Sequence, residues 1–176
     1  MKSQEPPSAG RWYGTAFRVR YQETDRMGVV YHANYLSWFE SGRTEMFRRL
    51  GLTYRSMEEM GVLLPVTAAD LQYKAPARYD DLVAVFARIT VCSALRVGYE
   101  YEVRRIGSGE AQAESVQEFP HFPAPLSREE LPGELLVAGT TSHVWVNGEW
   151  KPVRLDRALP ELYQAIQGAL GEEGGK

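Results

Sequence analysis

Residues 21–52 read YQETDRMGVVYHANYLSWFESGRTEMFRRLGL, and the second half of this stretch has the periodicity of a long helix. Apolar residues recur there at intervals of three and four, which places them on one side of a helix. The residues at this spacing are Leu36, Phe39, Arg43, Phe47 and Leu50, all apolar except Arg43, and Tyr35, Phe39, Gly42 and Met46 form an adjoining stripe. Asn34 suits the N-cap, and Gly51 suits the left-handed residue that ends a helix. We therefore expect a helix from about residue 34 to residue 50, with Gly42 allowing a close approach to whatever lies beneath it.

The chain on either side of this helix alternates between apolar and polar residues, as half-buried strands do. A first strand is expected from Arg11, with Phe17, Val19 and Tyr21 on one face. Further alternating segments are 62–66, 83–91, 97–103 and 135–146. Asn147-Gly148 predicts a type I′ hairpin turn into residues 149–154, and a closing helix is expected from 159 or 160 to 170. Together these elements predict an α+β fold in which a curved antiparallel sheet wraps around the long helix.

The segment before the last strand interrupts this rhythm. Ile106 to Glu110 has the composition of a hairpin tip, whereas residues 111–134 carry four prolines and could be removed without breaking the hairpin. We read residues 111–134 as an insertion with a short helix capped by Ser127 and Glu130. Such a segment either packs, through Phe119 and Phe122, or forms a surface loop.

The domain organisation follows from these elements. Residues 1–10 are rich in Pro, Ser and Gly and are expected to form a flexible tail. Residues 11–158 form the domain, with the insertion at about 111–134, and residues 159–176 form a C-terminal helix and tail.

Composition excludes several classes of function. The net charge of -3 gives no electrostatic basis for binding nucleic acid. Cys92 is the single cysteine, which excludes an internal disulfide and a multi-thiolate zinc site within one chain. No stretch has the ~20 apolar residues that span a bilayer, and the N-terminus lacks the apolar core of a signal peptide. We expect a soluble, cytoplasmic protein without membrane insertion.

The segment of residues 21–45, followed by YKAPARYDD at 73–81, resembles the 4-hydroxybenzoyl-CoA thioesterase-like branch of the hotdog-fold family. The specific part is an Asp-x-x-Gly-x-x-x-His/Tyr-x-Asn-Tyr signature, carried here by Asp25, Gly28, His32, Asn34 and Tyr35. The match covers about residues 14–110 and 135–155. It implies a hotdog fold, with a central helix wrapped by about five to six strands. It also implies dimers whose sheets join edge to edge, active sites at the dimer interface, and pairing of dimers into homotetramers.

The resemblance further implies an acyl-CoA thioesterase with Asp25 as nucleophile or as general base on water. No cofactor is implied, since coenzyme A is part of the substrate. The residues are consistent with a carboxylate mechanism, because the sequence has no Gly-x-Ser-x-Gly elbow and Cys92 lies inside a strand pattern. Taken alone, an Asp ahead of a helix is more often a cap or a turn residue.

Further substrate contacts are implied at the helix start. Gly28 allows a sharp turn or a close approach to the ligand, and the backbone N–H of His32 corresponds to the oxyanion donor. The His32 side chain either contacts the substrate and Asp25 or bonds to nearby backbone. The substrate-binding set is Gly28, Tyr31, His32, Asn34 and Tyr35, with Asn34 read as a cap and Tyr35 and Trp38 as core or pocket wall. The basic candidates for contact with the phosphates of coenzyme A are Lys74, Arg78, Arg88 and Arg96.

Three other functions remain open from the sequence. One is a hotdog dehydratase or hydratase, although the acid and histidine of that class are placed differently. Another is a non-catalytic acyl-CoA sensor that uses the same cleft. The third is a metal enzyme that uses His32, His121 and His143 with Asp25, but these histidines lack the spacing of metal ligands, so no metal is expected.

Overall fold

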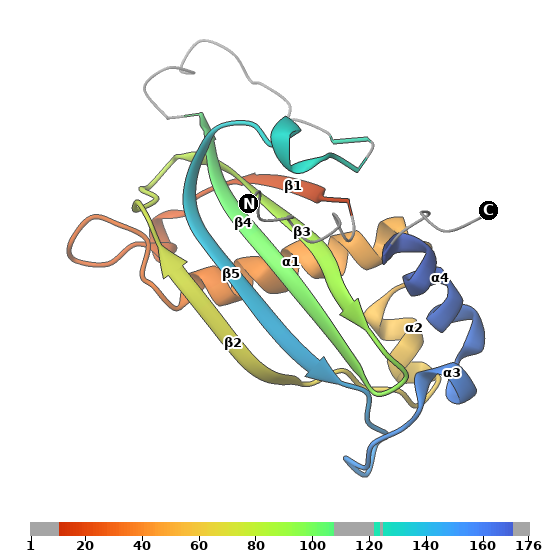
Figure 1. Cartoon of the computed structure of the whole chain (residues 1–176). Coiled ribbons are helices and arrows are strands. Elements are labelled where there is room, and N and C mark those ends of the chain that lie inside the picture. Colours follow the sequence, from red (N-terminus) through yellow and green to blue (C-terminus); the bar gives the residue numbers. More distant parts are fainter. Residues whose placement is uncertain (1–10, 108–121, 124, 171–176) are drawn as a thin grey trace, which may run out of the picture.

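In the computed structural model, which describes residues 11–107, 122–123 and 125–170, one long helix lies across a five-stranded antiparallel sheet (Figure 1). In chain order the elements are β1 (Tyr13–Arg18), η1 (Tyr21–Glu23), α1 (Asn34–Arg49), α2 (Tyr54–Glu59), β2 (Val66–Tyr73), β3 (Leu82–Cys92), β4 (Arg96–Gly107), η3 (Arg128–Glu130), β5 (Glu134–Val144), α3 (Leu155–Ala158) and α4 (Pro160–Leu170). The strand order β1-β3-β4-β5-β2 leaves β1 and β2 at the two edges. The predicted helix wrapped by a curved sheet is confirmed. None of the described helices combines the length and the apolar character that crossing a membrane requires.

The main core lies between α1 and the face of the sheet that meets it, here called the inner face. Phe39 of α1 stacks on Tyr101 of β4, with ring centroids 4.2 Å apart. Such an aromatic pair adds about 0.5–1.5 kcal/mol to stability beyond the burial of its surface. A Cβ at Gly42 would lie 2.7 Å from Cγ1 of Val85, so the glycine permits the close contact between α1 and β3. The close approach expected at Gly42 is therefore confirmed.

Helix α1 agrees with its predicted span but not with its predicted start. The residue before Asn34 occupies the N-cap, so the N-cap prediction is wrong; the Asn34 side chain instead donates from Nδ2 to the backbone carbonyl of Glu23 at 2.8 Å. Gly51 ends the helix with φ +83°, as predicted. Leu36 is exposed and Trp38 is buried, because the side of the helix that meets the sheet is rotated toward Trp38.

Strand β1 ends earlier than expected. It stops at Arg18, and Tyr21, expected on its apolar face, begins η1 and is 79% exposed. The carboxylate of Glu23 accepts the backbone N–H of Arg20 at 2.7 Å, and the Glu23 N–H donates to the carbonyl of Arg20. These two bonds close a turn at η1, which directs the chain away from the axis of β1.

Strand β2 lies further along the chain than the predicted segment 62–66. It spans Val66–Tyr73, and only Leu63 pairs before it, in a single bridge with Val146. Nearly all of β2 is exposed in the single chain. An edge strand without a buried face has no apolar alternation, so periodicity could not locate it.

The loop after β5 is a different turn from the one predicted. A type I′ turn requires positive φ at both Asn147 and Gly148, and neither has it. The Asn147 N–H donates to the carbonyl of Lys151 at 2.9 Å, and the left-handed residue is Trp150, with φ +61°. The connection is therefore a three-residue loop that ends in a left-handed residue. Helix α4 is confirmed, while α3 was not predicted.

Part of the predicted insertion packs on the outer face of the sheet, opposite α1. Trp12, Ala84, Phe86 and Leu131 form a second buried cluster, and Phe122 packs against it with its ring centroid 5.2 Å from that of Phe86. The predicted short helix is present as η3, where the Ser127 N–H donates to Oε2 of Glu130 at 2.7 Å.

Several predictions fall outside the described residues. The residues outside the described ranges include Phe119 and half of the predicted insertion, 111–121 and 124, as well as the expected tails, 1–10 and 171–176. At the other end of the insertion, β5 already begins at Glu134.

Candidate active site

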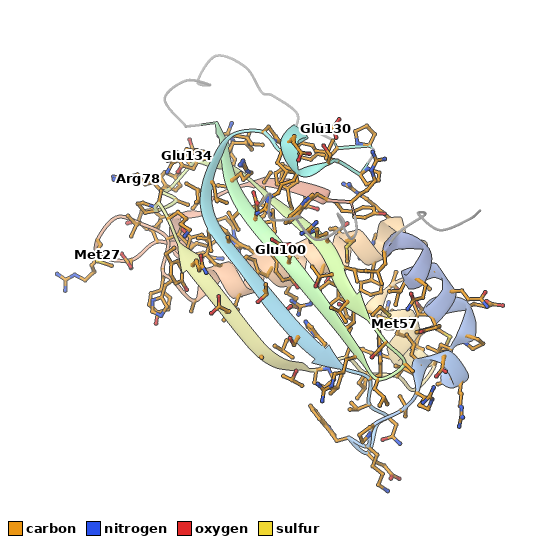
Figure 2. The ribbon with its side chains drawn as sticks, viewed as in Figure 1. Met27, Met57, Arg78, Glu100, Glu130 and Glu134 are labelled. Atoms are coloured by element: carbon orange, nitrogen blue, oxygen red, sulfur yellow. The ribbon has the colours of Figure 1, made fainter. Side chains whose placement is uncertain are left out.

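A cavity of about 270 Å³ lies where the loop before α1 meets the residues that follow β2. Its lining residues are Asp25, Met27, Val29, Val30, His32, Tyr35, Tyr73, Lys74, Ala75 and Pro76. Four of the predicted site residues, Asp25, His32, Tyr35 and Lys74, are thus grouped here, although they come from separate segments. The predicted residues Gly28, Tyr31 and Asn34 are not among the lining residues. Figure 2 shows Met27 and Arg78 at the same end of the molecule, where these segments meet.

Asp25 reaches the cavity from a short hairpin loop. The Asp25 N–H donates to the carbonyl of Val29 at 2.9 Å, and Gly28, with φ +74°, occupies the left-handed position of the loop. Oδ1 of Asp25 accepts the backbone N–H of Met27 at 2.8 Å. Asp25 is therefore both a turn residue and a lining residue of the cavity, so the two roles weighed for it are compatible.

This loop is attached to the strand side of the cavity. The Val30 N–H donates to the carbonyl of Ala77 at 2.8 Å, and Thr24 pairs with Val30 in an isolated bridge. The buried hydroxyl of Tyr35 accepts the N–H of Ala77 at 3.1 Å. Burial raises the pKa of the Tyr35 phenol, so this group stays neutral over the physiological pH range. Loop, helix and strand thus meet through the short segment around Ala77.

The start of α1 supplies backbone donors at the cavity. His32 lines the cavity, and the N–H groups of His32 and Ala33 make no hydrogen bond to the described part of the chain. Free N–H groups at a helix start, together with the positive end of the helix dipole, favour a negative charge nearby. The exposed His32 ring lies against Tyr31, with centroids 4.4 Å apart, and the hydroxyl of Tyr73 donates to the His32 carbonyl at 3.2 Å.

Glu23 is a residue near the site that the sequence did not single out. It is 7% exposed, and its Oε1 accepts the indole N–H of Trp38 at 2.9 Å. Burial by itself raises the pKa of this carboxyl, but hydrogen bonds from Trp38 and Arg20 outweigh burial and leave the pKa below its usual value. The spacing of Arg20 and Glu23 was a local sign of a turn, but no sequence signal pairs Glu23 with Trp38, which lies inside the helix.

The predicted basic residues separate into two pairs. Lys74 lines the cavity, and Arg78 is exposed just after it in the chain. Arg88 pairs with Glu100 and lies over the Trp12 ring of the outer cluster, 4.8 Å from its centroid. Arg96 lines a different groove, on β4, which the Asp25 cavity does not share. Arg26, which the sequence analysis did not name, is exposed in the Asp25 loop but is not among the lining residues of the cavity.

The structure gives a physical objection to the metal alternative. Both ring nitrogens of the buried His143 have protein partners, the hydroxyl of Thr141 and the carbonyl of Leu64. His32 lies at the helix start, and His121 is outside the described residues. No group of three or more His, Cys, Asp or Glu side chains in the described ranges is arranged to hold a metal ion. Burial raises the pKa of the Cys92 thiol to about 11, which disfavours the thiolate that a nucleophile would need.

The sequence and the fold of this chain have counterparts among known proteins. Residues 19–147 match the family model described as the thioesterase-like superfamily. YneP of Bacillus subtilis (strain 168), whose assignment as an acyl-CoA thioesterase is provisional, is 36% identical over 152 residues, which cover 86% of this chain and 92% of YneP. YbgC of Escherichia coli O157:H7, an acyl-CoA thioester hydrolase, is 40% identical over 73 residues, 42% of this chain and 54% of YbgC. The crystal structure of the DHNA-CoA thioesterase from Staphylococcus aureus superposes with a TM-score of 0.72, at 32% identity and 89% coverage of both chains.

Proposed function

This chain belongs to the thioesterase-like superfamily, and from that membership we infer that it hydrolyses acyl-CoA thioesters to a free acid and coenzyme A. The single observation that carries the proposal is the Asp25 cavity. There a carboxylate lies beside the two residues that precede α1, His32 and Ala33, whose backbone N–H groups make no bond to the described residues. A carboxylate and oriented backbone donors are the two components that acyl transfer without a serine or cysteine nucleophile requires.

In the proposed mechanism the thioester carbonyl oxygen points at the backbone N–H of His32. Negative charge develops on that oxygen as the carbonyl carbon becomes tetrahedral, and the N–H group stabilises it. Asp25 acts in one of two ways. Its carboxylate attacks the carbonyl carbon, expels the thiolate of coenzyme A and forms a mixed anhydride that water hydrolyses, or it removes a proton from a water that attacks directly. Oxygen-18 water in a single turnover distinguishes them, since the anhydride route leaves label in the Asp25 carboxylate.

The remaining predicted side chains have supporting positions in this proposal. Gly28 shapes the Asp25 loop, and Asn34 joins the helix start to Glu23. Tyr35 lines the cavity, whereas Tyr31 lies outside the lining and packs against the His32 ring. Lys74 and Arg78 are the candidates for the phosphates of coenzyme A in this protomer, because they are exposed at the cavity end. Arg88 and Arg96 would need a neighbouring protomer to reach the same ligand. No further cofactor is proposed, since the thioester brings its own coenzyme A.

We also propose a homodimer, or a dimer of dimers, in which two β2 strands pair edge to edge. Strand β2 is an edge strand whose residues are nearly all exposed, including Val66 and Tyr73. An unpaired apolar edge is a ready site for pairing with another chain. Because Tyr73 also lines the cavity, such a dimer would place the two active sites near the shared interface. We also propose a cytoplasmic location, because a chain with a single cysteine suits a reducing compartment.

A panel of acyl-CoAs assayed for release of free thiol tests this function. Thiol release from at least one acyl-CoA is the expected result. A change in acyl double-bond absorbance without thiol release would instead indicate a dehydratase or hydratase, and saturable binding without turnover would indicate a sensor. Loss of thiol release on treatment with a chelator would contradict the metal-free mechanism.

A further inference from the structure

We propose that Glu23 is a positioning residue, whose carboxylate sets the place of Asp25 relative to the free backbone N–H of His32, just before α1. This role rests on the thioester hydrolysis inferred above. Glu23 lies two residues before Asp25 and is not among the residues that line the cavity, so any effect it has on the reaction passes through its neighbours.

The side chain of Glu23 joins the segment before the Asp25 loop to the body of the helix. Its Oε1 accepts the indole N–H of Trp38 at 2.9 Å, and its Oε2 accepts the backbone N–H of Arg20 at 2.7 Å. The guanidinium of Arg20 adds a contact to Oε1 at 3.2 Å. Trp38 is itself buried and packs edge-on against Tyr35, a lining residue of the cavity.

The backbone of Glu23 makes a second connection, at the other end of the same loop. Its carbonyl accepts the N–H of Tyr31 at 2.9 Å and the side-chain amide of Asn34 at 2.8 Å. Residues 24–30, which contain the Asp25 loop, therefore lie between Glu23 and Tyr31, whose N–H is bonded to the Glu23 carbonyl. His32, whose free N–H is the proposed oxyanion donor, follows that residue. A shift of Glu23 would change the separation between the reacting carboxylate and the donor.

The charge of Glu23 is needed for both side-chain bonds at once. Because the hydrogen bonds from Trp38 and Arg20 keep the carboxyl ionised, each oxygen acts only as an acceptor and faces a donor. A glutamine has the same shape, but its amide NH₂ would face either the indole N–H or the Arg20 N–H. Glu23→Gln thus removes one of the two bonds and leaves the volume unchanged.

Glu102 offers a matched control. It is also a buried glutamate, 2% exposed, and it pairs with Arg104 and Arg128 on the outer face of the sheet. None of these residues lines the Asp25 cavity. Glu102→Gln should therefore lower stability through the same loss of a charged acceptor, with no path to the reaction.

The experiment measures kcat, KM and Tm for the wild type, Glu23→Gln, Trp38→Phe, the double variant and Glu102→Gln, with the best acyl-CoA of the panel. A misplaced carboxylate should lower kcat about 10- to 100-fold in Glu23→Gln, with KM changed less than about threefold. Trp38→Phe should lower kcat in the same direction, and the double variant should lose less than the product of the two single losses, because both changes act on the same set of contacts around the residue 23 side chain. Glu102→Gln should keep kcat within about twofold while losing Tm.

The possible outcomes separate this role from the function on which it rests. If the wild type and Asp25→Asn differ sharply in turnover but Glu23→Gln keeps the wild-type kcat, the positioning role is overturned and the function stands. A fall in kcat no larger than that of Glu102→Gln overturns it as well. If Glu23→Gln does not fold, Trp38→Phe decides, since it keeps the carboxylate and its Arg20 contacts. A wild type that releases no thiol overturns both proposals.

Discussion

Oδ1 of Asp25 accepts the backbone N–H of Met27 at 2.8 Å, so the proposed catalytic carboxylate also closes the first turn of its own loop. The loop after β5 contains the same contact made by an amide, where Oδ1 of Asn147 accepts the N–H of Glu149 at 3.0 Å. Both loops end in a left-handed residue, Gly28 in one and Trp150 in the other. An asparagine is therefore compatible with this turn in the same protein.

Asp25→Asn therefore tests whether the charge of the residue 25 side chain is needed for the reaction, without removing the hydrogen bond that closes its loop. The amide oxygen can keep the bond to Met27, while the charge that attacks the carbonyl or takes a proton from water is lost. We expect kcat to fall about 10²- to 10⁴-fold, with Tm and the affinity for an acyl-CoA nearly unchanged. Single-turnover thiol release and a binding titration measure the two quantities separately. Turnover close to that of the wild type would end the carboxylate mechanism.

Gly28 should be sensitive to substitution for a conformational reason alone. A Cβ at this position meets nothing within 4 Å, but the backbone has φ +74°. Gly28→Ala should therefore lower the free energy of unfolding by about 1–2 kcal/mol and lower kcat, because the same loop positions Asp25. Urea unfolding and the thiol-release assay measure the two effects.

Gly148→Ala is the matched control for this change. Gly148 also lies in a three-residue hairpin loop with open space around its Cβ position, but its φ is not positive. We expect Gly148→Ala to change stability by less than about 0.5 kcal/mol. Equal losses in the two variants would show that the left-handed position has no special cost.

His143 should make the stability of the protein depend on acidity. Burial, together with the nearby charge of Arg43, lowers its pKa from 6.5 to about 4. Between those two values the unfolded chain binds a proton that the folded chain does not, so acidification favours unfolding. The free energy of unfolding should fall by up to about 2 kcal/mol from pH 6.5 to pH 5 on account of this group.

His143→Gln removes the titration and should flatten that dependence. The carbonyl of Leu64 can only accept, so Nδ1 of His143 carries the proton and Nε2 accepts from Thr141. A glutamine can donate and accept, although with less favourable geometry. Urea denaturation of both proteins at several pH values measures the difference. Parallel loss of stability in wild type and variant would assign the acid sensitivity to other groups.

Val66 tests the proposed pairing of β2 strands. It lies on the edge strand and is 49% exposed, whereas Val91, 58% exposed, lies on β3 inside the sheet order. A lysine at each position adds the same charge to an exposed valine. We expect Val66→Lys to raise the fraction of monomer by light scattering at micromolar concentration, because a charged lysine on an edge strand opposes pairing with another strand. Val91→Lys should leave the dimer intact, and a wild type that is monomeric would contradict the pairing.

The sequence by itself predicted those helices and strands that bury one face against a hydrophobic core. Helix α1 and strands β3 and β4 were located because apolar residues repeat with the period of the element wherever one face meets a core. Gly51 marked the end of α1, since a left-handed residue favours glycine whatever the tertiary context. The Asp-to-Tyr signature also located the candidate site. Asp25 and Tyr35 are close in the chain and are brought together by local turns, so a short stretch of sequence was enough to identify them.

Only the tertiary structure decided which distant residues share a surface. It placed β2 at an exposed edge, where periodicity carries no information, and it gave Asn34 and Trp38 a common partner in Glu23. It also put Lys74 at the cavity and Arg88 on the opposite face of the sheet, although their side chains have the same charge. Local patterns report the burial of one segment, whereas hydrogen bonds between segments depend on how the whole chain is packed, and that information is not present in any single stretch of residues.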